Sequence, residues 1–158
     1  MKKILFITLI GLLLLSCSDD KKNTKNANFI PPMQIEISDE IKGDAELVDL
    51  VKSSEKAINE FSNNIEQIAI DGKDVLHKDF NIEEASFTEK IQVGKLLLEF
   101  GSNSTQMIAT MQKYNSHIEE RQKTGELNKN QLKALEQVSE ALQNRINKIN
   151  KKYQHYFE

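Results

Sequence analysis

Residues 86–123 read SFTEKIQVGKLLLEFGSNSTQMIATMQKYNSHIEERQK and hold the most regular apolar pattern in the chain. Apolar and small side chains recur there at alternating four- and three-residue steps, which places them on one face of an α-helix. Ser86 and Glu89 have the spacing of a capping box, and Gly125 is a stop signal. We therefore expect a helix of about 37 residues, some 55 Å long. The face comprises Val93, Leu97, Phe100, Ser104, Met107, Met111, Tyr114 and Ile118.

Four weak helix formers, Gly-Ser-Asn-Ser at 101–104, lie in the middle of this stretch. They predict a bent but continuous helix, and a break into two helices is the alternative.

Two further amphipathic stretches flank the central one. The first follows Asp44, a plausible N-cap, and ends at Gly72; the second begins at Asn128, which can cap with Gln131 reaching back. Three long helices joined by one longer and one short connection predict an all-α fold, an antiparallel three-helix bundle. The expected apolar positions are Leu47, Val51, Ile58, Phe61, Ile65 and Ile68 in the first stretch, and Leu135, Val138, Leu142, Ile146, Ile149, Tyr153 and Tyr156 in the second.

Two segments outside these helices also carry apolar residues. The connection 73–85 contains four large hydrophobic residues, so we expect it to fold as a short helical turn over one end of the bundle. In residues 29–37 two prolines forbid a helix, and Met33, Ile35 and Ile37 alternate with polar residues. This extended segment either lies along the domain, or offers a strand to the sheet edge of a partner, or stays disordered.

Charge and motif content exclude several classes of function. The full chain carries a net charge of −3, and loss of Lys2 and Lys3 with a signal peptide makes it more acidic, which argues against a nucleic-acid partner. The sequence has no glycine-rich phosphate loop, serine elbow or paired metal ligands. His77 and the pair His117 and Glu120 lack the further ligands that a metal needs. We expect a non-catalytic protein without cofactor or metal.

The N-terminus has the features of a secretory signal peptide. Lys2 and Lys3 precede an apolar run, 4–15, that is short for a bilayer span and ends at the small residue Ser16. Cys17 is the only cysteine, so no intrachain disulfide is possible. Leu14, Ser16 and Cys17 resemble the lipobox of bacterial lipoproteins, although Leu15 is larger than the usual residue there. The resemblance implies that the Cys17 thiol carries diacylglycerol, that the chain is cut before it, and that the protein is anchored to a membrane.

Ser18, Asp19 and Asp20 resemble the export signal of surface-exposed lipoproteins in Bacteroidetes. That resemblance implies an outer-membrane protein whose domain faces outward; the alternative is an ordinary charged tether and a domain facing the periplasm. The expected organisation is a signal peptide over 1–16, a lipidated cysteine and flexible tether over 17–42, and the helical domain over 43–158.

We interpret the chain as a helical module that binds another envelope or secreted protein. The central helix is about ten residues longer than its neighbours, so apolar side chains near one end should lack a partner within the bundle. Phe100, Met107 and Met111 are the predicted partner-binding residues, because methionines beside a bend suit a surface that repacks. The alternative is an immunity-type lipoprotein that neutralises a toxin, or an accessory of a secretion apparatus, in a Bacteroidetes-like bacterium.

Overall fold

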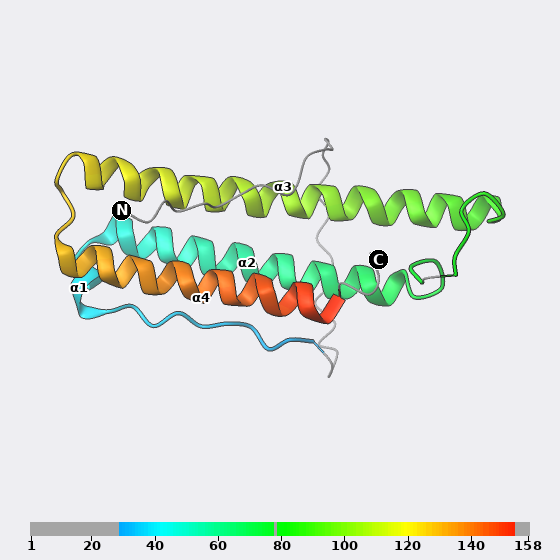
Figure 1. Cartoon of the computed structure of the whole chain (residues 1–158), viewed down its shortest axis with the longest axis horizontal. Coiled ribbons are helices and arrows are strands. Elements are labelled where there is room, and N and C mark those ends of the chain that lie inside the picture. Colours follow the sequence, from blue (N-terminus) through cyan, green and yellow to red (C-terminus); the bar gives the residue numbers. More distant parts are fainter. Residues whose placement is uncertain (1–28, 78, 154–158) are drawn as a thin grey trace.

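The computed structural model describes residues 29–77 and 79–153, which form an all-α bundle (Figure 1). The helices are α1 (Asp39–Lys42), α2 (Ala45–Asp71), α3 (Phe87–Lys123) and α4 (Lys129–Tyr153), and no strand occurs in these residues. The chain runs up α2, back along α3 and up again along α4, so the predicted three-helix bundle is confirmed. The signal peptide, Cys17, the Ser18–Asp20 motif and Tyr156 lie outside the described residues.

Helix α2 is the centre of the bundle. It packs against both α3 and α4, whereas α3 and α4 approach each other less closely. The hydroxyl of Tyr114 on α3 donates a hydrogen bond to the carbonyl oxygen of Leu135 on α4 at 2.9 Å, and burial raises the pKa of this phenol. The buried residues of α2 are Leu47, Leu50, Val51, Ser54, Ile58, Phe61, Ser62, Ile65, Glu66, Ile68 and Ala69.

The helix caps lie where their sequence signals predict them. The Asp44 carboxylate accepts a hydrogen bond from the amide of Leu47 at the start of α2. At the start of α3 the capping box of Ser86 and Glu89 is complete, which satisfies two otherwise unpaired amides. Asn128 accepts bonds at α4, and Gln131 reaches back to the Asn128 amide at 3.0 Å. The starts of the three long helices are therefore set by local hydrogen bonds.

Helix α3 is continuous through 101–104, as expected. Ser104 is buried in the seam, where a small side chain lets α2 and α3 approach. Asn64 of α2 donates a hydrogen bond to the side chain of Asn103 at 2.8 Å. Two of the weak helix formers, Asn103 and Ser104, therefore lie in the contact with the bundle, and the segment does not mark a break.

The predicted apolar face of α3 is wrong at one position. Leu97 is 62% exposed, and its neighbour Leu96, at 4%, is the buried residue. On α4 the predicted Ile146 packs partly against the core, and its neighbour Arg145 is buried as well. A strict 3.5-residue repeat drifts by about 20° per heptad relative to a straight helix of 3.6 residues per turn, so the buried face passes to a neighbouring position.

The connection 73–85, described except for residue 78, contains turns and bends and no assigned helix. The predicted helical turn is present at its start, where the amides of Val75 and Leu76 both donate to the carbonyl oxygen of Gly72. Val75 is buried, and Leu76 and Phe80 pack partly against the core. Ile82 remains 46% exposed. The connection therefore covers the end of α2 but leaves apolar surface uncovered.

The three consecutive leucines at 96–98 give a matched test of this packing. Leu96→Ala should destabilise the domain by about 2–4 kcal/mol, because it removes buried methyl groups and leaves a cavity. Leu97→Ala, which removes the same atoms from an exposed side chain, should change stability by about 0.5 kcal/mol or less. Urea unfolding measures both, and equal losses for the two variants would contradict the burial of Leu96 in place of Leu97.

Candidate protein-interaction surface

Helix α3 extends beyond its neighbours at its N-terminal end. It has 37 residues, against 27 in α2 and 25 in α4. Figure 1 shows the extra turns running past the ends of both other helices, next to the 73–85 connection. Side chains on the outer side of these turns have no helix beside them.

Four positions form what we call the outer face of α3: Phe87, Ile91, Gly94 and Leu98. Their spacing of four, three and four residues places them on one side of the helix, away from the buried Leu96. Phe87 is 79% exposed, Ile91 56% and Leu98 62%. The outer face is therefore a continuous apolar row on a surface helix.

The predicted partner-binding residues lie elsewhere. Met107 and Met111 are buried, at 7% and 9% exposure, and Phe100 is packed partly against the core. Both methionines therefore pack inside the bundle, and the partner-binding role of these three residues stays a prediction. The uncovered end of α3 was expected from its length, but Phe87, Ile91 and Leu98 were not part of the predicted apolar stripe, in which Leu97 is the exposed member.

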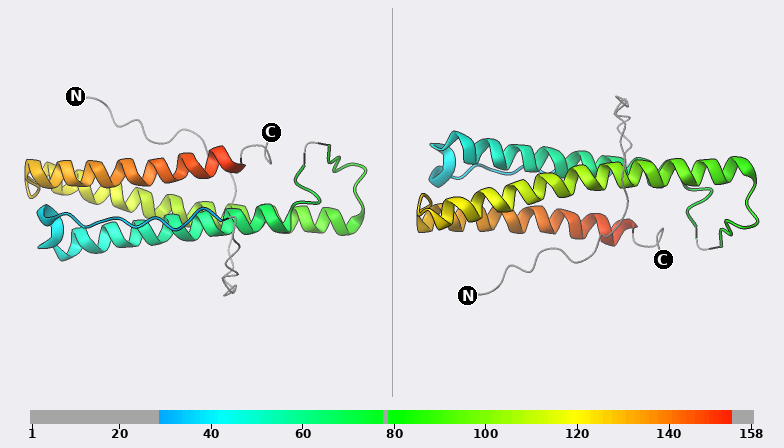
Figure 2. Two further views of the ribbon diagram at one scale, coloured as in Figure 1. Left: turned by 90° about the horizontal axis from the view of Figure 1, so that it is seen from below. Right: turned by 90° about the horizontal axis from the view of Figure 1, so that it is seen from above.

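The N-terminal segment is bound along α2, where Figure 2 shows it in blue. We call residues 30–37 the strap. Asn59 accepts a hydrogen bond from the Met33 amide at 2.8 Å and donates one to the Met33 carbonyl at 2.9 Å. Glu55 accepts from the Ile35 amide at 2.6 Å, and Lys52 donates to the Ile35 carbonyl at 3.0 Å. Side chains of α2 thus satisfy the extended backbone of the strap.

The N-terminal end of the strap meets a buried arginine. Arg145 of α4 donates to the carbonyl oxygens of Pro31 at 2.6 Å and Ile30 at 3.0 Å, and to the hydroxyl of Ser62 at 2.7 Å. Glu66 accepts from the Ile30 amide at 2.6 Å. Burial lowers the pKa of the Arg145 guanidinium, and the Glu66 carboxylate opposes that shift. Strap, α2 and α4 are therefore joined by one polar cluster.

These contacts correct the predicted domain boundary. Ile35 and Ile41 are buried in the core, so residues from 30 onward belong to the helical domain and not to a flexible tether. The sequence alternative in which residues 29–37 lie along the domain is confirmed. The strap is ordered because its apolar side chains are buried while α2 and α4 supply partners for its backbone.

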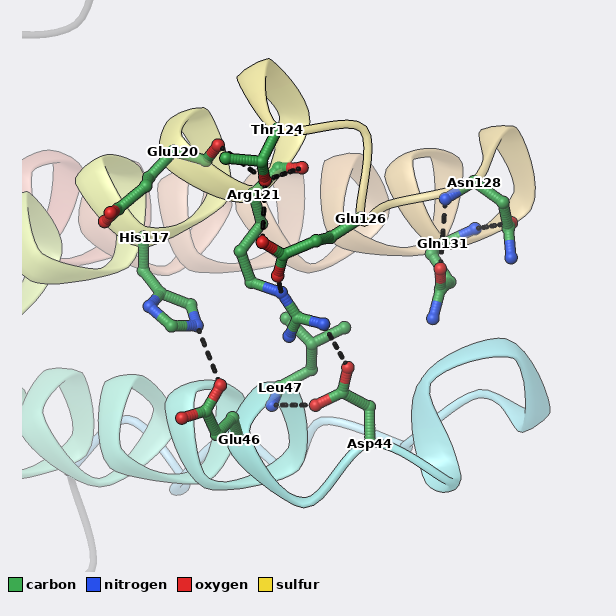
Figure 3. A network of polar contacts seen from close by, with 10 residues as sticks. All are labelled: Asp44, Glu46, Leu47, His117, Glu120, Arg121, Thr124, Glu126, Asn128 and Gln131. Atoms are coloured by element: carbon green, nitrogen blue, oxygen red, sulfur yellow. Dashed lines mark hydrogen bonds and ion pairs between the residues drawn. The ribbon is translucent and has the colours of Figure 1, made fainter.

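A second polar network ties the opposite end of the bundle together (Figure 3). Arg121 of α3 lies 2.6 Å from the Asp44 carboxylate and 3.2 Å from that of Glu126. The bond from Arg121, together with that from the Leu47 amide, holds the pKa of Asp44 below its usual value. The side chain of Arg121 is only 14% exposed. This network joins three segments and is structural.

The described residues offer few other sites. Among residues 29–77 and 79–153, no group of three or more His, Cys, Asp or Glu side chains is placed to hold a metal ion. No helix in the same ranges combines the length and apolar content needed to cross a bilayer. Comparison with known proteins found no matching family, no matching curated protein and no matching solved structure.

Residues that hold the strap were missed from the sequence, although a signal was present. Glu55, Asn59, Ser62 and Glu66 recur at four, three and four residues beside the apolar stripe of α2, and Arg145 lies between Leu142 and Ile149 at seam spacing. A polar row bordering an apolar one suggests a bound backbone, but nothing in the spacing names which segment is bound.

Replacing Asn59 tests how the strap is held. Asn59→Ala removes both bonds to Met33, so amide hydrogen exchange in residues 33–35 should accelerate by about ten-fold, equivalent to ~1.4 kcal/mol. The matched control is Asn64→Ala on the same helix, whose side chain bonds Asn103 and does not contact the strap. Unchanged exchange in Asn59→Ala, or equal acceleration in both variants, would contradict the assignment.

Proposed function

We propose that this protein is a lipid-anchored lipoprotein of the cell envelope that binds another protein through the outer face of α3 and performs no catalysis. One observation carries the binding part: Phe87, Ile91 and Leu98 form an exposed apolar row on a helix that extends beyond its own bundle.

The extra turns of α3 expose apolar surface that a partner could bury. Single exposed apolar residues are ordinary, but a continuous row on one helix face is typical of an interaction site. The row contributes little to the stability of the isolated domain, because its side chains are mostly in solvent. Burial against a partner would recover about 25 cal/mol for each Å² of apolar surface removed from water.

The charged residues of the two polar clusters hold segments of the fold together. Arg145 and Glu66 bind the strap, while Arg121 and Asp44 join helix ends. Both clusters are held by contacts within the fold, while Glu66 Oε2, Arg145 Nε and Arg121 Nη1 are buried without a hydrogen-bond partner in the described residues. The role that these contacts support is to hold a rigid scaffold for the outer face.

The anchor part of the proposal rests on the sequence. Leu14, Ser16 and Cys17 resemble a lipobox, and Ser18-Asp19-Asp20 resembles a Bacteroidetes surface-export signal. We propose an outer-membrane lipoprotein with its domain outside the cell; a periplasm-facing domain is the alternative. An immunity-type or secretion-accessory role would use the same anchor and the same surface with a more specific partner.

Replacing Cys17 tests the anchor. Cys17→Ser should abolish labelling by a fatty-acid analogue and release the protein from the membrane fraction, because the thiol is the attachment atom in the lipobox reaction. Labelling and fractionation in the producing cell are the measurements. The control is Ser18→Ala, which keeps the thiol. Normal labelling of Cys17→Ser would show that the lipobox interpretation is wrong.

Crosslinking in cells tests the surface. A photo-crosslinking amino acid at Ile91 should give a discrete adduct with another protein, since that position lies in the middle of the exposed row. The same substitution at Lys133, an exposed residue of α4, is the control. Adducts of equal yield and pattern from both positions would count against a specific surface on α3.

A further inference from the structure

We infer that the outer face of α3 binds an amphipathic α-helix whose apolar stripe is flanked by acidic residues, in the manner of a short coiled coil. This inference rests on the proposed function and specifies the chemistry of the partner.

The spacing of the outer face fits a helix. Phe87, Ile91, Gly94 and Leu98 occupy successive d and a positions of a heptad, the pattern that lets side chains of one helix insert between those of another. The row covers about three turns, roughly 18 Å, which matches a partner helix of similar length. Helix α2 ends beside the middle of this row, where the Gln92 side chain donates to the carbonyl oxygen of Asp71. The side chains of Phe87, Ile91 and Leu98 are all more than half exposed, so the approach of a partner helix to the row is open.

Gly94 points independently to a partner. A glycine inside a helix is unfavourable relative to alanine, so it needs a reason. No atom of the described chain explains it, because a Cβ built on Gly94 meets nothing within 4 Å. Between Ile91 and Leu98, however, the missing side chain leaves a recess where a large side chain of a second helix fits. The glycine is explained if a side chain of a partner helix comes close to the backbone of α3 at this position.

The charges beside the row select the partner. The flanking e and g positions are Thr88, Lys90, Lys95 and Leu97, so both charges are positive. The Lys90 ammonium donates only to the carbonyl oxygen of Glu83 at 3.2 Å, and Lys95 has no ion-pair partner within residues 29–77 and 79–153. A helix with Glu or Asp beside its apolar stripe would pair with both lysines.

A second copy of this chain fits less well. In a parallel pairing, g positions face e positions, which would bring Lys90 against Lys95 of the other copy. In an antiparallel pairing like positions face each other, so the lysines would meet Leu97 and Thr88 and gain no carboxylate. The outer face is therefore complementary to a different, acidic helix.

Two synthetic helices test the inference against the full-length protein kept in a mild nonionic detergent. Both are four heptads long with leucine at a and d; one carries glutamate at e and g, the other lysine. Fluorescence anisotropy should show the acidic peptide binding at least about ten-fold more tightly than the basic one. The double variant Lys90→Glu with Lys95→Glu should invert the preference. Lys133→Glu, an equal change of charge on α4, should leave the preference unaltered.

Gly94→Ala separates binding from folding. An alanine should raise the melting temperature, because the helix interior favours it and space is free. It should also lower the affinity for the acidic peptide several-fold, because the added methyl group fills the recess between Ile91 and Leu98. A variant that is more stable and binds equally well would show that no close approach occurs there.

Other outcomes would overturn the inference without deciding the proposed function. The crosslinking experiment at Ile91 decides the proposed function separately. Equal affinity for the two peptides, or no binding of either, would exclude an acidic helix. A concentration-dependent dimer in sedimentation that Leu98→Ala abolishes would make a second copy the occupant. A specific crosslink from Ile91 alongside either result would mean that a partner binds this surface by other chemistry, whereas absence of that crosslink would count against the proposed function itself.

Discussion

The packing of α2 against α3, α4 and the strap is the interaction on which the rest of the molecule depends. Its apolar stripe faces α3 and α4, while Asn59 and Glu55 bind the backbone of the strap. Because one helix organises both surfaces, loss of α2 packing would release every other segment. The bundle therefore behaves as one cooperative unit in which the strap is a structural member.

The polar cluster of Arg145 and Glu66 shows how the strap is kept in one register. Both side chains are almost fully buried, and each bonds the backbone of residues 30–31. A buried charge left without its partner costs about 3–5 kcal/mol of folding free energy. A strap shifted along α2 would leave such a charge unpaired and would therefore be much less stable. Hydrophobic contacts such as that of Ile35 are less directional. The charged side chains of Arg145 and Glu66 thus fix the position of the strap along the helices. Its apolar side chains supply most of the free energy that holds it there.

Much of the fold could be predicted from local sequence, and the surfaces could not. Capping signals at Asp44, Ser86 and Asn128 set the helix starts because they act within one turn. The choice between Leu96 and Leu97 depends on the accumulated rotation of a long helix against its neighbours, which a short window does not measure. Two partners of Arg145 in the strap, Ile30 and Pro31, lie more than a hundred residues away, so only the assembled fold brings them together.

Under the proposed anchor at Cys17, the direction in which the strap is bound would have a mechanical consequence. With Ile30 fixed beside Glu66, about 13 residues separate the domain from Cys17, a leash of at most ~45 Å. Tension on that leash would load the bonds at Ile30 and Pro31 first and then those at Met33 and Ile35, peeling the strap away one contact at a time. Complete peeling back to Gly43 would lengthen the leash to about 26 residues, or ~85–90 Å. Detachment of the strap would then lengthen the connection between Cys17 and the domain under force, before the force reaches the helical bundle.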